Sequence, residues 1–151
     1  MILAAELHDL GKKRAVWQRS IGNRAPEIWL AKSGGKREPI ELTDYRHEFG
    51  SLLDAEPRSE DAEIEDDARD LVLHLIAAHH GRGRPHFPPD EAFDPERPRD
   101  DSARVAAEVP RRFARLQRQY GRWGLAYLES LLRAADYAAS AHPSAPTEER
   151  S

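Results

Sequence analysis

The chain has 151 residues, of which 39% are hydrophobic and 33% charged, and this size and composition fit one domain with a single core. It contains no cysteine, which excludes disulfide bonds and thiolate metal sites. The formal net charge of -4 gives no bulk attraction to nucleic acid, so any such binding would need local basic patches. No apolar run approaches the ~20 residues of a membrane span, and no signal-peptide pattern is present, so we expect a cytoplasmic protein with no membrane partner.

The hydrophobic pattern predicts an all-α fold for a domain over residues 1–140. Helices are predicted at 2–10, 13–21, 45–55, 69–80 and 102–140, the last with a break near Gly121–Gly124. Between 27 and 42, two short apolar runs flank a glycine pair, which predicts a small hairpin or an irregular loop.

Three further segments read as irregular. The acidic segment 56–70 is predicted to be a solvated loop leading into a helix. Residues 81–100 contain five prolines and are predicted to be an extended loop. The tail 141–151 is predicted to be disordered.

Histidine and acidic residues occur where the predicted helices end. His8 and Asp9 close the first helix, and His79 and His80 close the helix over 69–80. Asp136 follows three leucines at steps of three and four residues, so it lies on or beside an apolar stripe. A carboxylate facing a core is costly unless it is paired or bound to a metal. Helix caps, salt bridges to arginine and simple exposure are the alternatives.

Imidazole and carboxylate donors together suit Mn, Fe, Co, Ni or Zn ions. A carboxylate that bridges two such ions suits hydrolysis of a phosphodiester, because two ions can activate a water and clamp the phosphate. His74 lies on the same helix as His79 but five residues earlier, so it points in another direction and is predicted to be a core histidine.

Four motifs carry a family resemblance. They are LHDLGK (7–12), RHEFGSLL (46–53), AAHHGRGRP (77–85) and LLRAADYAAS (131–140). In this order they resemble the HD-domain metal-dependent phosphohydrolases. The phrases RHEFGS, HHGRGRPHF and YGRWGLAYLESLLRAADYAAS are more similar to the HD nuclease domain of the CRISPR type I interference helicase-nuclease, in its subtype I-G (formerly I-U) form. The resemblance extends from Leu3 to about Ser140.

The resemblance implies an HD-domain helical bundle with endonuclease or exonuclease activity on single-stranded DNA in antiviral defence. Two divalent ions, of Mn, Ni, Co or Fe, would be the cofactors. The implied partners are single-stranded DNA, a CRISPR guide-RNA surveillance complex, and a helicase domain that is fused or separate. An HD phosphohydrolase acting on nucleotides and a non-catalytic docking domain are the alternative functions.

The resemblance also assigns roles to residues. His8, Asp9 and Asp136 would bind a first metal, and Asp9 would bridge to a second metal bound by His47, His79 and His80. Asp9 and Lys12 would be catalytic, with Lys12 near the scissile phosphate. The family pattern has a further histidine upstream of the His-Asp doublet, and only seven residues precede His8. We therefore expect one ion to bind well and the other weakly.

Local basic groups could contact DNA. Arg82 and Arg84 flank the second metal motif on a glycine loop, and Arg111, Arg115, Arg118 and Arg122 would form one stripe on a continuous helix. The alternative for the stripe is a solvated face that pairs with the acidic 56–70 segment. Trp17, Trp29 and Trp123 are predicted to be core residues rather than stacking platforms.

Overall fold

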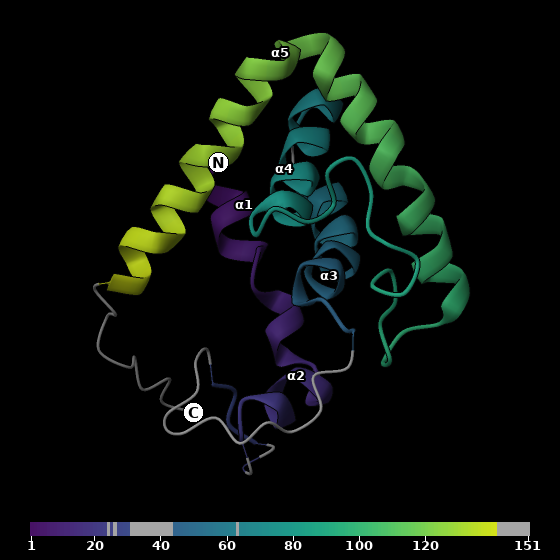
Figure 1. Ribbon diagram of the computed structural model, residues 1–151, viewed down its shortest axis with the longest axis vertical. Helices are drawn as coiled ribbons and strands as arrows, with labels where there is room; N and C mark the ends of the chain where they lie inside the picture. The colour runs from purple at the N-terminus through teal and green to yellow at the C-terminus, as the bar shows by residue number, and fades with distance from the viewer. Residues whose placement is uncertain (24, 26, 31–43, 63, 142–151) are drawn as a thin grey trace.

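The computed structural model describes residues 1–23, 25, 27–30, 44–62 and 64–141. Its elements are α1 (Ile2–Leu7), the 3-10 helix η1 (Leu10–Lys13), α2 (Ala15–Ser20), α3 (His47–Asp61), α4 (Asp66–Ala78) and α5 (Arg99–Ala141) (Figure 1). The described residues contain no strand, which confirms the predicted all-α fold. Residues 27–30 contain a turn and a bend and no strand, whereas 31–42, the rest of the predicted hairpin or loop, and the tail 142–151 lie outside the described residues.

The core lies where α3 and α4 pack against each other and against α5. Phe49, Leu52, Ile76 and Val105 have no exposed surface. Every residue from 72 to 78 is buried. This explains why the second half of α4 is apolar on all sides apart from His74, because a helix segment that is covered all round has no solvent-facing polar side. In the described part of the chain, no helix is both long enough and apolar enough to cross a membrane.

α5 is bent at Gly121, where the backbone has φ 68° and ψ 171°. A residue with a Cβ rarely adopts this positive φ, so glycine permits the turn. The bend confirms the predicted break and divides α5 into a first arm (99–120) and a second arm (122–141). Figure 1 shows the two arms diverging from the bend, with the second arm passing α1.

The prediction of a loop at the start of the acidic segment is wrong for residues 56–61. These residues continue α3 to Asp61, with Pro57 inside the helix. Leu52, Ala55 and Ser59 are fully buried at helical spacing, so one face of the segment packs on the core although its other face is acidic.

The proline-rich segment between α4 and α5 forms neither helix nor strand, as expected. Phe87 of this segment packs edge-on against Phe49 of the core, with 5.2 Å between the ring centroids.

Candidate metal centre

His8 and Asp9 lie at the junction between α1 and η1. His8 follows the last residue of α1 in helical conformation, and Asp9 is the residue before η1. Nδ1 of His8 donates a hydrogen bond to the carbonyl oxygen of Ala5 at 2.7 Å. Because a carbonyl can only accept, Nδ1 carries the proton and Nε2 is left with a free lone pair. Metal-binding histidines are commonly oriented in this way.

His79 repeats this arrangement at the end of α4. Its Nδ1 donates to the carbonyl oxygen of Ile76 at 2.7 Å, so its Nε2 is also free to accept. His79 is 2% exposed and directly follows the helix, whereas the adjacent His80 is exposed. The glycine at 81 has φ 80°, which turns the chain away immediately after the two histidines.

The carboxylate of Asp9 lies between three histidines. Its Oδ1 is 3.6 Å from Nε2 of His47 and 4.0 Å from Nε2 of His79, and its Oδ2 is 3.5 Å from Nε2 of His8. Four of these buried atoms have no hydrogen-bond partner: His8 Nε2, Asp9 Oδ1, His47 Nε2 and His79 Nε2. Such atoms each cost about 1–3 kcal/mol when they are unsatisfied. Their convergence fits a cation, since imidazole and carboxylate donors bind transition metals at roughly 2.0–2.2 Å.

All six predicted ligands meet in this region. Two overlapping groups have donor atoms within 4.8 Å of one another: His47, His79 and His80, and His8, Asp9 and His79. Asp136, on the second arm of α5, places Oδ1 at 3.5 Å from Nε2 of His8. The arrangement differs in one respect from the expected one. Only Asp9 was expected to lie between the two groups of ligands, but His79 also belongs to both groups.

Burial sets the protonation of the histidines. It lowers the pKa of His47 to about 2, with help from the neighbouring His79 and Lys12. It also lowers the pKa of His79 to about 4. Burial alone would raise the pKa of Asp9, but the hydrogen bond from Lys12 and the nearby His8 outweigh it and hold this pKa below its usual value. The site is therefore two neutral imidazoles facing an ionised carboxylate, which is the protonation state that metals require.

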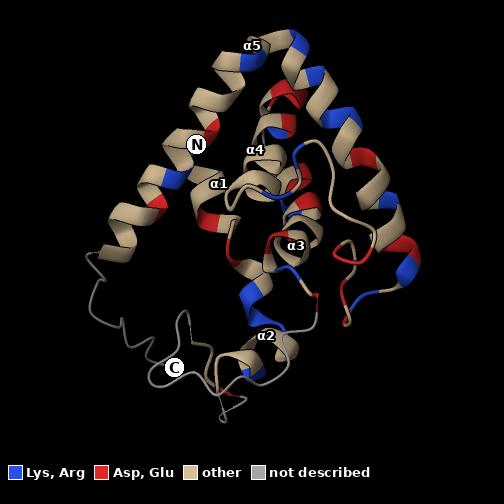
Figure 2. Cartoon of the chain, viewed as in Figure 1, with Lys and Arg blue, Asp and Glu red and all other residues tan. Residues whose placement is uncertain are grey.

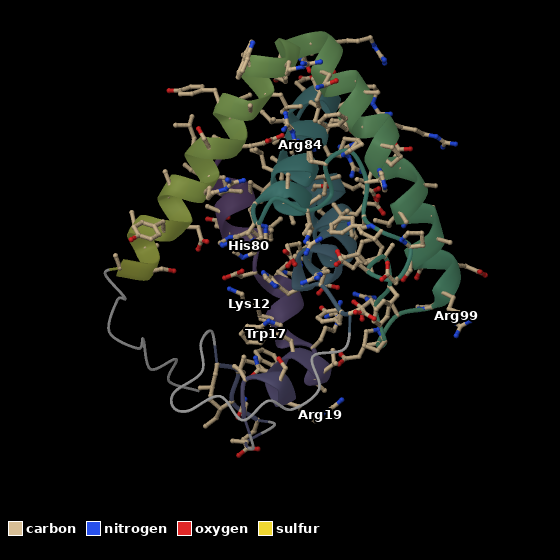
Figure 3. All side chains as sticks on the ribbon, in the orientation of Figure 1. Lys12, Trp17, Arg19, His80, Arg84 and Arg99 are labelled. Atoms are coloured by element: carbon tan, nitrogen blue, oxygen red, sulfur yellow. The ribbon has the colours of Figure 1, made fainter. Side chains whose placement is uncertain are left out.

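Lys12 lies on η1, one turn after Asp9, and its Nζ is 2.7 Å from Oδ2 of Asp9. The same ammonium lies 5.7 Å from the centroid of the Trp17 ring. Figure 3 shows Lys12 between His80 and Trp17, at the edge of the cluster. Its charge therefore lies at the rim of the centre, where it faces the carboxylate of Asp9.

Gly11 allows η1 to pack directly on the start of α3. A Cβ at this position would lie 2.1 Å from the carbonyl oxygen of His47 and 2.7 Å from the amide nitrogen of Ser51. The Gly11 amide donates to Oγ of Ser51 at 2.8 Å, and its carbonyl accepts from the hydroxyl of Tyr45 at 2.8 Å. This contact sets the position of the His8-Asp9 doublet relative to His47.

Sequence reasoning missed three supporting residues, although all of them lie in or beside the phrase RHEFGS that supplied His47. Two are Ser51 and Tyr45, which hold Gly11. The third is Glu48, whose Oε2 lies 3.4 Å from Nδ1 of His47 and which is 4% exposed. A buried carboxylate beside Nδ1 favours a proton there and leaves Nε2 free for an ion.

The arginines expected to bind DNA are mostly engaged in ion pairs. Arg82 lies 3.5 Å from Glu91, and Arg84 lies 3.0 Å from Glu129. Arg115 binds Asp70 at 2.6 Å, which is the pairing with the acidic segment that was the alternative for the stripe.

The expected stripe is also shorter than four residues. Arg111, Arg115 and Arg118 lie on the first arm, whereas Arg122 follows the bend at Gly121, so the helix carrying the stripe is not continuous. Arg111 lies 3.7 Å from Glu108. Figure 2 shows acidic and basic residues interspersed along the first arm rather than a single basic face.

The predictions for one histidine and three tryptophans can be compared with the structure. His74 is buried and hydrogen-bonded to Glu129 at 2.8 Å, which confirms it as a core histidine. Trp17 is partly buried, with its ring 6.3 Å from that of His47. Trp29 and Trp123 are 61% and 84% exposed, so their prediction as core residues is wrong.

Comparison of the chain with protein-family models, curated proteins and solved structures finds no match. The arguments about function therefore rest on the residues and their geometry, together with the resemblance of the four motifs.

Proposed function

We propose that this chain is a metal-dependent nuclease of the HD-domain type that hydrolyses phosphodiester bonds of single-stranded DNA. The observation that carries the proposal is the convergence of unpartnered buried atoms from His8, Asp9, His47 and His79. A core does not gain stability from such an arrangement, because each unsatisfied group raises the free energy of the folded state. A site that binds cations accounts for all four atoms at once.

The donor set fits two transition-metal ions. His47, His79 and His80 form one group, and His8, Asp9 and Asp136 form the other, with Asp9 and His79 between them. When bound, a pair of divalent ions supplies an activated water and a clamp for the phosphate oxygens. The resemblance favours Mn, Ni, Co or Fe.

Three side chains have roles in this proposal, one at the metal centre and two toward the phosphate. Asp9 orients the centre, since its two carboxylate oxygens face different histidines. Lys12 is at the rim, and its ammonium offsets negative charge that develops on the phosphate during hydrolysis. Arg82, which is 45% exposed in its side chain, supplies a further cation on the loop after His80 and makes binding salt-dependent.

The resemblance places this activity in CRISPR type I interference, in which a guide-RNA complex exposes single-stranded DNA and a helicase domain works with the nuclease. The structure offers few unpaired arginines near the centre to bind DNA on its own. This is consistent with an enzyme to which a partner delivers the strand, so that pairing with the guide RNA supplies the specificity.

The test is a cleavage assay on circular single-stranded DNA with Mn²⁺ or Ni²⁺, comparing the unaltered chain, Asp9→Asn and the exposed loop variant Asp90→Asn. Cleavage that requires metal, survives in Asp90→Asn and disappears in Asp9→Asn supports the proposal. Release of phosphate from nucleotides without DNA cleavage would replace it with a nucleotide phosphohydrolase. No metal-dependent hydrolysis of either substrate would overturn it.

A further inference from the structure

The second arm of α5 has an apolar outer face. Trp123, Tyr127, Leu131, Ala134 and Ala138 follow one another at steps of four, four, three and four residues, so they form one ridge along the helix. We call these five residues the outer ridge. Trp123 is 84% exposed, Tyr127 63% and Leu131 38%. Ser130 and the 78% exposed Tyr137 flank it.

Apart from Arg122, which is exposed beside the bend, the charged residues of the second arm contact the rest of the molecule. They are Glu129, Arg133 and Asp136. Glu129 accepts from His74, Arg133 donates to the carbonyl oxygen of His79, and Asp136 lies beside His8. Figure 2 shows that charged residues are sparser along the second arm than along the first. A surface helix normally places its charges outward, so this arm has the pattern of a helix that is covered on both sides.

The chemistry of the outer ridge favours a protein over a nucleic acid. Exposed aromatic rings can stack on bases, but proteins that bind single strands combine such rings with cations that follow the phosphates. The outer ridge and its two flanking residues include no cation. An uncharged face rich in Trp and Tyr, with small residues between them, has instead the composition of a protein interface core.

The outer ridge is complementary to itself. Its large residues, Trp123 and Tyr127, lie in the N-terminal half, and its small residues, Ala134 and Ala138, lie in the C-terminal half. In an antiparallel pair of such helices, Trp123 faces Ala138 of the other copy and Tyr127 faces Ala134. Large residues then enter the spaces over small ones, which is how helices pack closely. Leu131 and Ser130 lie at the centre, next to the two-fold axis.

The area is also adequate. A whole Trp or Tyr side chain buries about 150–250 Å² when covered. Because Trp123, Tyr127 and Tyr137 are 84%, 63% and 78% exposed, covering them in both copies would bury roughly 700–1,100 Å² in total. This is more than half of the roughly 1,200–2,000 Å² of a stable interface, before Leu131 and the alanines are added. We propose that the chain forms a symmetric dimer through the outer ridges of two copies, packed antiparallel on their second arms. The metal centre is left accessible in this dimer, because its ligand Asp136 lies on the inner side of the same helix.

The first experiment measures the mass of the chain in solution against concentration, by sedimentation or light scattering. The expected result is a monomer–dimer equilibrium. Tyr127→Glu should raise the dimer dissociation constant at least about thirtyfold, the effect of removing a central aromatic from an interface. The matched control is Ile2→Glu, which changes a residue that is 79% exposed on α1. A monomer at all concentrations would overturn the proposal, as would a dimer broken by Ile2→Glu and not by Tyr127→Glu.

A second experiment tests the register. Because the chain has no cysteine, a single introduced cysteine can form a disulfide only with the same position of the other copy. Under mild oxidation, Ser130→Cys should form a disulfide-linked dimer, since the two copies of this position meet near the two-fold axis. Ala138→Cys should not, because an antiparallel register separates its two copies by about 20 Å at 1.5 Å of rise per residue. Cross-linking of both variants would mean a parallel pair, and cross-linking of neither would mean another surface; either result overturns the proposed packing.

Discussion

Lys12 donates a hydrogen bond from Nζ to Oδ2 of Asp9 at 2.7 Å, while Oδ1 of the same carboxylate faces His47 at 3.6 Å. One carboxylate thus has one oxygen satisfied by an ammonium and the other left without a hydrogen-bond partner. Under the proposed function this division would separate two roles, since Asp9 would bind the ion through Oδ1 and Lys12 would assist the chemistry without binding the ion.

Replacing Lys12 with methionine should therefore reduce cleavage without reducing metal affinity. We expect the rate of hydrolysis in Lys12→Met to fall about 10²–10³-fold, the usual effect of removing one group that stabilises charge in the transition state. Manganese affinity, measured by calorimetry, should stay the same or rise, because Asp9 loses a competing cation. Lys13→Met is the matched control, since Lys13 is exposed and contacts the Trp29 ring rather than Asp9. A parallel loss of metal affinity in Lys12→Met would contradict this division of roles.

Asp9→Asn should abolish metal binding while leaving the helices intact. The amide keeps the shape of the side chain but removes the negative charge that faces both His8 and His47. We expect no heat of manganese binding at concentrations that saturate the unaltered chain, together with an unchanged far-UV circular dichroism spectrum. Asp90→Asn should bind like the unaltered chain. Full affinity in Asp9→Asn would show that the histidines alone hold the ion.

Lowering the pH from 7 to 5 should already destabilise the metal-free protein, before the pH reaches the range in which carboxylates titrate. The pKa values of His47 and His79 are lowered to about 2 and about 4 in the fold, against 6.5 when unfolded. Their contribution to stability is fully present above pH 6.5 and is lost as the pH falls toward the folded values, because only the unfolded chain takes up the protons. We expect the loss to be about 1–2 kcal/mol per histidine at pH 5.

Urea unfolding in the presence of a chelator measures this effect. The unfolding midpoint should drop between pH 7 and pH 5, and His47→Gln should weaken the drop. His86→Gln, in the exposed loop, should leave it unchanged. Equal midpoints at the two pH values would mean that the two histidines accept protons in the folded state.

Gly11→Ala should destabilise the fold and disturb the metal centre together. The added methyl would meet two backbone atoms, the His47 carbonyl oxygen at 2.1 Å and the Ser51 nitrogen at 2.7 Å. Backbone cannot rotate away, so we expect a cost at or above the roughly 1–3 kcal/mol of an overpacked core. Gly124→Ala is the control: the nearest atom, Tyr120 Cβ, is 3.5 Å away, and alanine in a helix should stabilise by up to about 1 kcal/mol. Similar unfolding midpoints for the two variants would contradict the close contact of η1 with α3.

The helices and the two doublets at helix ends could be predicted from the sequence because each depends on local pattern, whereas the roles of the doublets and of His47 were implied only by the resemblance. The apolar run of α4 and the glycine at 121 determine a helix and a bend within a few residues of themselves. His8, Asp9, His79 and His80 stand out because polar donors directly follow apolar helices. Even so, α3 extends six residues further than predicted, to Asp61. The acidic composition of this extension favoured a loop, but its buried face, which includes Ser59, packs on the core.

Pairings between distant segments could not be predicted in the same way. The contact of Gly11 with Ser51 and Tyr45, and the ion pair of Arg115 with Asp70, depend on how helices pack after they form. The exposure of Trp123 has a similar origin. Its helical spacing allows a core position, but the bend at Gly121 directs Leu125 and Leu132 inward and Trp123 outward.

The position of Asp136 has a consequence for the dynamics of the backbone. His8 is near the start of the described chain and Asp136 near its end, yet their side chains lie 3.5 Å apart. An ion bound between them would link the two ends of a segment that includes most of the polypeptide, and because it binds the folded state it would stabilise that state by mass action. The end of the second arm would then exchange its amide hydrogens slowly in the presence of metal and faster after chelation, so occupancy of the centre could be followed at a helix far along the sequence from the His-Asp doublet.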